Sequence, residues 1–409
     1  VRSARAFCCA LLLMLAGARV AAAAAAPDFP VPAALRIQVK FWQKIFGVYS
    51  QHQIVFHDPE NLGRVYSVLD FRDRAAAGDS ALVLEILQRE AVAKERERIR
   101  GVILRLDARQ GNSGGLDDEE RKLWDLFGKD KDPRRFAPAA DPARIRTQRG
   151  LRERFSEGVR ISRRYLAEME EVFRREGLPT QLPRLPLVES CFDIEAYSKV
   201  GAAGIWQFMP STGRSYMAIA GVVDERRDPL RATRGAALHL KANYEALGSW
   251  PLAITAYNHG RAGVARAVRD TGSSDIGVVV KRYRGPLFGF ASRNFYAEFL
   301  AALAVERSYK DYFGDLQFDA PFTGDEIQLS DALGAHVAAR CADIPPEELA
   351  ALNPAVDSAV FLGAGNIPRG YLLRVPPGSA GAFQQRLAHI AADARVVAVT
   401  PGRGGYARA

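Results

Sequence analysis

One glutamate in this sequence stands where it could act as an acid. Glu189 directly follows the largely apolar run Pro186-Leu187-Val188, so burial of that run would also remove water from its carboxyl group. Desolvation disfavours the charged form of a carboxylic acid and raises its pKa. A carboxyl that stays protonated near neutral pH can protonate a glycosidic oxygen. A solvated glutamate at a helix end is the alternative that this segment alone leaves open.

A second segment, Ser198 to Thr212 (SKVGAAGIWQFMPST), carries groups that proteins commonly use to hold sugars. Trp206 and Phe208 offer flat apolar faces, and Gln207 can both donate and accept hydrogen bonds. Gly204 would allow another backbone to approach closely. A tight turn with a buried tryptophan and a hydrogen-bonded glutamine is the alternative interpretation.

A third segment, Ala253 to Gly263, ends an apolar helix with Tyr257 and Asn258, and Gly260 supplies the stop. A tyrosine hydroxyl near a glutamate would tune its protonation, and an asparagine amide could hold an acetamido group. Either residue could instead be a helix cap. The sequence shows no Cys/His spacing typical of a metal site and no phosphate-binding loop, so no metal or cofactor is expected.

Helices must position these segments. Apolar residues recur every three or four positions from Leu151 to Phe173, and Gly177 and Pro179 follow, which predicts one long amphipathic helix. Its apolar stripe should belong to the core.

The regions before and after the three motif segments are predicted to form separate parts of the molecule. Residues 31–142 predict a helical N-terminal region that ends in a Pro-rich linker, taken as a domain boundary. His52 and His57 lack nearby cysteines, which favours surface or packing histidines over metal ligands. Residues 322–380 predict a small C-terminal module, and residues 395–409 a flexible Gly-rich tail.

Composition excludes several classes of protein. The 409 residues suggest two or three domains, and 48% hydrophobic with 25% charged residues excludes bulk disorder, collagen and multi-span membrane proteins. The net charge of +9 favours an acidic partner, such as nucleic acid, an anionic membrane face or an acidic polymer.

The N-terminus predicts export. Two arginines, an apolar run from Phe7 to Ala16 and an alanine tract that ends before Pro27 are typical of a secretory signal peptide at residues 1–26. The run is too short to span a bilayer, and an uncleaved anchor is the alternative. Cleavage would lower the net charge to +6 and leave Cys191 and Cys341, expected as unpaired buried thiols. The protein should then act in the periplasm or the cell envelope, with no transmembrane span.

Together, the three segments resemble one family. The order Glu189-Ser190, then GIWQ at 204–207, then AYN at 256–258 looks like the lytic transglycosylases of the goose-lysozyme-like superfamily, most of all the membrane-bound lytic murein transglycosylase D group. The resemblance covers about residues 146–307. It implies a mainly α fold, with a lysozyme-like α-helical catalytic domain at 146–315 that acts on peptidoglycan glycan strands rather than nucleic acid.

The resemblance also implies residue roles. Glu189 becomes the catalytic acid and base that cleaves the MurNAc–GlcNAc bond with formation of 1,6-anhydromuramic acid. The residues that orient the sugar or that glutamate become Ser190, Ser198, Gln207, Tyr257 and Asn258.

Three points stay open at this stage. The family often has a Glu-Thr pair and a tyrosine where this chain has residues 291–295 and then Tyr296, and one residue of helix shift turns a side chain by about 100°. A hydrolytic muramidase that uses water and Asp193, or a peptidoglycan-binding scaffold without activity, is an alternative function. The C-terminal module looks like a degenerate lysin motif, with a purely structural cap as the alternative.

Overall fold

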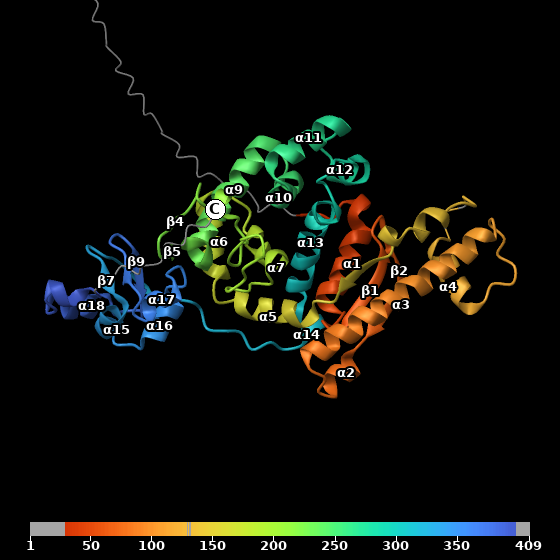
Figure 1. Ribbon diagram of the computed structural model, residues 1–409. Helices are drawn as coiled ribbons and strands as arrows, with labels where there is room; N and C mark the ends of the chain where they lie inside the picture. Colours follow the sequence, from red (N-terminus) through yellow and green to blue (C-terminus); the bar gives the residue numbers. More distant parts are fainter. Residues whose placement is uncertain (1–28, 129, 131, 398–409) are drawn as a thin grey trace, which may run out of the picture.

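The computed structural model describes residues 29–128, 130 and 132–397. The expected signal peptide therefore lies outside the described residues, as does the expected tail from residue 398 on. The described chain is mainly helical, which confirms the expected mainly α class (Figure 1). No helix in these ranges has the length and apolar character that a membrane crossing requires.

The N-terminal region contains a sheet as well as helices. Its helices are α1 (Arg36–Gly47), α2 (Arg72–Ala76), α3 (Ala81–Ala108) and α4 (Asp118–Leu126). Strands β1 (Gln53–Asp58) and β2 (Asn61–Asp70) form an antiparallel hairpin, and β3 (Arg146–Arg149) pairs with the other edge of β1. The prediction of a helical region over residues 31–142 is therefore wrong at β1 and β2. Residues 54–58 are all buried, so the strand shows no alternation of polar and apolar residues by which to recognise it.

The expected boundary near residue 142 does not separate two independent units. Strand β3 lies just beyond it and pairs with β1. Phe136, in the expected linker, is fully buried against α4 and α3, so the linker is packed. Helix α1 belongs to the central core, where its Trp42 indole donates a hydrogen bond to Asn294 at 3.2 Å.

His57 is a packing histidine between Phe41 and the central helices, and burial lowers its pKa to about 4.

The central domain is mainly helical. Its helices are α5 (Arg152–Ser162), α6 (Leu166–Arg175), α7 (Pro186–Glu189), α8 (Pro210–Gly213), α9 (Pro229–Leu247), α10 (Trp250–His259), α11 (Arg261–Thr271), α12 (Ile276–Arg282), α13 (Phe290–Arg307) and α14 (Tyr309–Phe313), with a short hairpin of β4 (Ile219–Ala220) and β5 (Val223–Asp224). Helix α13 contacts α1, α7 and α10, so it connects the N-terminal region to the segments with the motifs.

The single helix predicted from Leu151 is two helices, α5 and α6, because the chain turns at residues 163–165. The carbonyl of Arg164, freed by this turn, accepts a hydrogen bond from the Phe322 amide at 2.8 Å. The apolar stripe nevertheless lies in the core as expected, with Phe155 and Phe173 fully buried.

The C-terminal module has its own hydrophobic core and an α+β fold. Its elements are β6 (Asp325–Gln328), β7 (Leu333–Gly334), α15 (Ala335–Ala342), α16 (Pro346–Leu352), α17 (Ser358–Phe361), β8 (Asn366–Ile367), β9 (Leu372–Val375) and α18 (Ala380–Ala388). Strands β6 and β9 pair antiparallel, and β7 pairs with β8. The module lies beside the β4–β5 hairpin, at the opposite end of the molecule from α4 (Figure 1). Cys341 in this module and Cys191 are both free thiols.

Candidate active site

Glu189 ends the single turn of α7, which Pro186 starts. The chain then turns sharply, because Cys191 and Phe192 both have positive φ angles, 54° and 57°. This conformation is strained for residues with a side chain and marks a constrained loop. Gly158 on α5 faces this turn, and a Cβ there would overlap the carbonyl of Cys191. The turn thus holds the chain directly after Glu189 against α5.

The Glu189 side chain is partly buried, and among the described residues no hydrogen bond or ion pair reaches its carboxyl group. Burial raises its pKa from an ordinary value of 4.5 to about 8. Because no hydrogen-bond donor or cation among the described residues stabilises the carboxylate, desolvation sets the direction in which the pKa of Glu189 shifts. The carboxyl is therefore mainly protonated at neutral pH, which is the state that the sequence predicted.

The Ser198–Thr212 segment is held by its own hydrogen bonds. The Ser198 hydroxyl accepts from the Ala202 amide at 2.9 Å, and the Gln207 side chain donates to the Gly204 carbonyl at 2.8 Å. Trp206 is fully buried, and its indole nitrogen donates to the Thr233 hydroxyl at 2.9 Å. The expectation that Trp206 and Phe208 offer faces to a sugar is wrong, because Phe208 is buried as well. A core of helices behind the loop covers Trp206, so the alternative interpretation of a buried tryptophan holds.

Two hydrogen bonds join the three motifs. The Ser190 hydroxyl donates to the Ile205 carbonyl at 3.0 Å, and the Tyr257 hydroxyl donates to the Trp206 carbonyl at 2.7 Å. The pKa of Tyr257 is raised well above its ordinary value, first by burial and then by the charge of Glu189. The tyrosine of the third motif therefore lies within electrostatic reach of the glutamate of the first.

Asn258 is solvent-exposed, and its side-chain oxygen accepts a hydrogen bond from the Ser292 hydroxyl at 3.1 Å. The stretch that departs from the family pattern thus contributes Ser292 to this edge of the site. Tyr296 is 3% exposed, and burial raises its pKa. It is part of the core rather than a group at the surface of the site.

A second carboxyl lies near Glu189, and the sequence reasoning missed it. Glu298 is on α13, which packs against α7, and it is partly buried. Burial, and then the charge of Glu189, raise its pKa to about 8. Two carboxyls that share one dry site cannot both ionise easily, so their titrations are coupled. A lone glutamate in the otherwise apolar run FYAEFLAA was the available signal. Asp193 and Glu195 are exposed, as expected.

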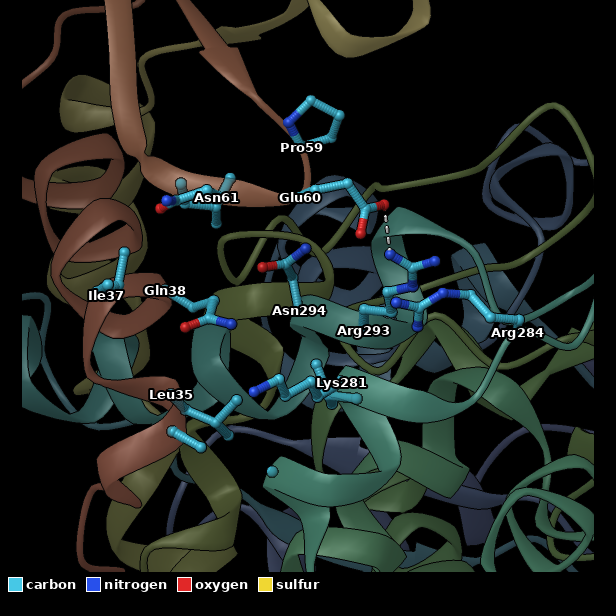
Figure 2. A pocket seen from close by; sticks show the side chains of 14 residues that line it. Leu35, Ile37, Gln38, Pro59, Glu60, Asn61, Lys281, Arg284, Arg293 and Asn294 are labelled. Atoms are coloured by element: carbon cyan, nitrogen blue, oxygen red, sulfur yellow. Dashed lines mark hydrogen bonds and ion pairs between the residues drawn. The ribbon is translucent and has the colours of Figure 1, made fainter. Parts of the chain in front are cut away.

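A separate hollow lies between α1, the β1–β2 turn, α12 and α13 (Figure 2). Its polar side chains include Gln38, Lys281, Arg284 and the Glu60–Arg293 ion pair, whose atoms are 2.7 Å apart. None of the predicted site residues lines it. Across the described ranges, no group of three or more His, Cys, Asp or Glu side chains is arranged to hold a metal.

The motif-bearing segment matches a known family. Residues 170–279 match the family described as Transglycosylase SLT domain. A stretch of 99 residues is 40% identical to membrane-bound lytic murein transglycosylase D from two strains of Escherichia coli, and it covers 24% of this chain and 22% of that relative. The structure overlaps lytic transglycosylase Slt from Pseudomonas aeruginosa, solved as an inactive mutant, with a TM-score of 0.33 and 20% identity, over 60% of this chain and 38% of that one.

The family match includes Glu189 and the five other predicted site residues, whereas Glu298 lies beyond it. The aligned stretch spans about a fifth of the length of the curated relatives. The resemblance to the lytic transglycosylases that the motif order indicated is thus confirmed for this segment of the chain.

Proposed function

We propose that this protein is a lytic transglycosylase that cleaves the MurNAc–GlcNAc bond of peptidoglycan without consuming water. The observation that carries the proposal is the Glu189 carboxyl, whose pKa of about 8 keeps it protonated at neutral pH. A protonated acid is what a glycosidic oxygen needs to become a leaving group. The match of residues 170–279 to the Transglycosylase SLT domain supports the same class of reaction.

One carboxyl suffices for this reaction. Glu189 gives its proton to the oxygen that joins the two sugars, and the bond between that oxygen and the anomeric carbon breaks. The N-acetyl group of the muramic acid residue stabilises the positive charge left on the anomeric carbon. The Glu189 carboxylate then takes the proton of the C6 hydroxyl, whose oxygen bonds to the anomeric carbon and closes a 1,6-anhydro ring. Glu189 ends in its starting protonation state.

The neighbouring residues position the acid rather than react. The hydroxyl hydrogens of Ser190 and Tyr257 are already donated to main-chain carbonyls of the Ser198–Thr212 segment. Both side chains therefore fix the distance between α7, this segment and α10. Ser198 and Gln207 hold the segment in shape, and the exposed amide of Asn258 is available to an acetamido group of the substrate.

Hydrolysis is the alternative, and the second carboxyl gives a reason to consider it. Hydrolytic glycosidases use two carboxyl groups, one of them ionised as base or nucleophile. Glu298 does not fit that role at neutral pH, because burial raises its pKa to about 8 as well. Asp193 is exposed on the surface. The non-hydrolytic reaction therefore agrees better with the charge states of both groups.

We also propose that the protein is exported to the cell envelope and that its C-terminal module is similar to a lysin motif. The Arg-flanked apolar run before Pro27 supports export. The module's strands β6 and β9 pair antiparallel, and α15 and α16 lie between them in the chain together with the short elements β7, α17 and β8. The two outer strands with two helices between them support the second proposal.

Digestion of purified sacculi followed by mass spectrometry tests the function. Products with 1,6-anhydromuramic ends are expected from the unaltered chain. Glu189→Gln should lower their yield by about a thousandfold or more, because it removes the proposed acid. Glu168→Gln, on an exposed part of α6, is the matched control and should not change the yield. Reducing-end products that are heavier by one water would show hydrolysis instead.

A further inference from the structure

The C-terminal module and the loop with the second motif together form a hollow. It has a volume of about 510 Å³, within the range of small-ligand sites. Glu195 and Tyr197 line it from the loop after α7, Arg214 and Arg227 from the segments around the β4–β5 hairpin, and Asp357 from the module. Neither part of the chain forms this hollow alone.

Main-chain hydrogen bonds hold the module against the hairpin. The Asp224 amide donates to the Ala355 carbonyl, and the Asp357 amide donates to the Val222 carbonyl, both at 2.8 Å. Residues 223 and 356 also form an antiparallel bridge. Because these bonds are made by backbone atoms on the wall of the hollow, the two sides of the hollow have a fixed separation.

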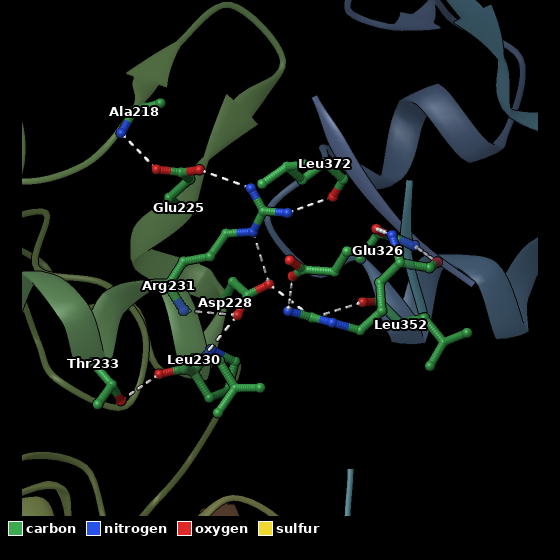
Figure 3. A network of polar contacts seen from close by, with 12 residues as sticks. Ala218, Glu225, Asp228, Leu230, Arg231, Thr233, Glu326, Leu352 and Leu372 are labelled. Atoms are coloured by element: carbon green, nitrogen blue, oxygen red, sulfur yellow. Dashed lines mark hydrogen bonds and ion pairs between the residues drawn. The ribbon is translucent and has the colours of Figure 1, made fainter. Parts of the chain in front are cut away.

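A buried charge network also joins the C-terminal module to the start of α9 (Figure 3). Asp228, at the start of α9, is fully buried and contacts Arg231 at 3.3 Å and Arg374 of the module at 3.0 Å. Arg374 also contacts Glu326 at 3.1 Å. Buried ions tolerate separation from their partners poorly, because each would be left desolvated and unpaired. The module is therefore a fixed part of the molecule rather than a domain on a loose tether.

The side chains around the hollow suit a saccharide. Tyr197 is 69% exposed, so its ring is available for stacking on a sugar face, while its hydroxyl lies beside Arg226. Two guanidinium groups and three carboxylates line the hollow, and they can bind hydroxyl and acetamido groups in their plane. One of the carboxylates, Asp224, is paired with Arg226 behind the wall. The formal charges of the other four groups cancel, which favours a neutral polar ligand over an anion.

The hollow lies close to the proposed acid along the chain. Glu195 is six residues after Glu189, so their backbones are at most about 22 Å apart. Tyr197 directly precedes Ser198, and its backbone bridges to Ala203 inside the second motif segment. The hollow is therefore built from residues that directly follow the proposed acid and begin the second motif.

We propose that the hollow is a distal saccharide site, through which the C-terminal module extends the glycan-binding surface beyond the segment with Glu189. This inference rests on the proposed function, because it takes the ligand to be a glycan strand. The site binds sugar rings by stacking on Tyr197 and by hydrogen bonds to Arg227 and Asp357.

Affinity as a function of oligosaccharide length tests the inference. The full chain with Glu189→Gln, which prevents turnover, is titrated with a disaccharide and a hexasaccharide of N-acetylglucosamine. Adding Tyr197→Ala should weaken binding of the hexasaccharide about tenfold. Tyr197→Phe keeps the ring and should bind as the parent does. Asp357→Asn should also weaken the hexasaccharide while it keeps the hydrogen bond from the Ala359 amide that caps α17.

The matched control is Glu347→Gln on the exposed side of α16, which should bind both sugars as the parent chain does. Unchanged hexasaccharide affinity in both Tyr197→Ala and Asp357→Asn, with unaltered thermal melting, overturns the inference. The sacculus digest, carried out with Glu189 intact, reports separately on the proposed function. Anhydro products from that digest, together with unchanged affinities, would leave the function standing and reject only the distal site.

Discussion

The pKa of Glu189 makes a prediction that does not depend on any substrate. In the unfolded chain this carboxyl titrates near pH 4.5, whereas in the folded protein its pKa is about 8. Between these values the unfolded state releases the proton and the folded state keeps it. The stabilisation that the protonated form provides is complete below pH 4.5 and is lost as the pH rises towards 8. Replacement by glutamine, which never ionises, removes this dependence.

The magnitude follows from the size of the shift. Between pH 4.5 and pH 8, each rise of one pH unit lowers the free energy of unfolding by about 1.4 kcal/mol, because Glu189 is ionised in the unfolded state but protonated in the folded state. Between pH 5 and pH 7 the loss amounts to about 2 to 3 kcal/mol. The advantage of Glu189→Gln over the parent chain in free energy of unfolding should grow by that amount over the same interval.

Urea unfolding at pH 5 and pH 7 measures this difference directly. The dependence of the free energy of unfolding on urea concentration should be the same for both chains, which shows that they expose the same surface on unfolding. Glu168→Gln is the control for loss of an exposed carboxyl and should show no growth with pH. If Glu189→Gln and the parent chain differ by the same free energy at both pH values, the carboxyl is not held protonated by burial. The proposed role of Glu189 as an acid at neutral pH would then be refuted.

Two further predictions concern the surroundings of the acid. Gly204 has φ of 71°, and a Cβ there would overlap the carbonyl of Arg226, so Gly204→Ala should cost at least about 2 kcal/mol of stability, measured by thermal melting. Gly221, also at positive φ but with open space around it, is the control, and an equal loss at Gly221→Ala would contradict the steric argument. Glu189→Gln removes the charge that helps to raise the pKa of Glu298, so the pKa of Glu298, measured by NMR titration of its side chain, should fall below that in the parent chain. A Glu298 pKa that is the same in both chains would show that the two carboxyls are not coupled.

The local pattern of the sequence was enough for the helical class and for the burial of the candidate acid. Glu189 follows an apolar run that had to be buried, so its protonation was predictable from neighbours in the chain. The stop of α10 at Gly260 was equally local, because a glycine there satisfies the end of the helix without strain. The order of the three motifs along the chain was sufficient to indicate the family.

Long-range contacts decided the rest. Strand β1 forms because β2 and β3 pair with its two edges. Strand β3 lies about ninety residues further along the chain, so the pattern of residues near β1 does not predict this pairing. Trp206 was expected at a sugar face, but its burial depends on the stacking of Phe173, from another helix, against its ring.

The sequence by itself determined the motif order and the helical class and indicated Glu189 as the candidate acid, since these depend on residue type and short spacing. Only the tertiary structure brought Glu298 to Glu189, because α13 is distant in sequence and packs on α7 through the core. It also joined the C-terminal module to the second motif loop, through backbone bonds and the buried Asp228–Arg374 pair. Such contacts have no local signature, because they depend on which surfaces meet once the chain has folded.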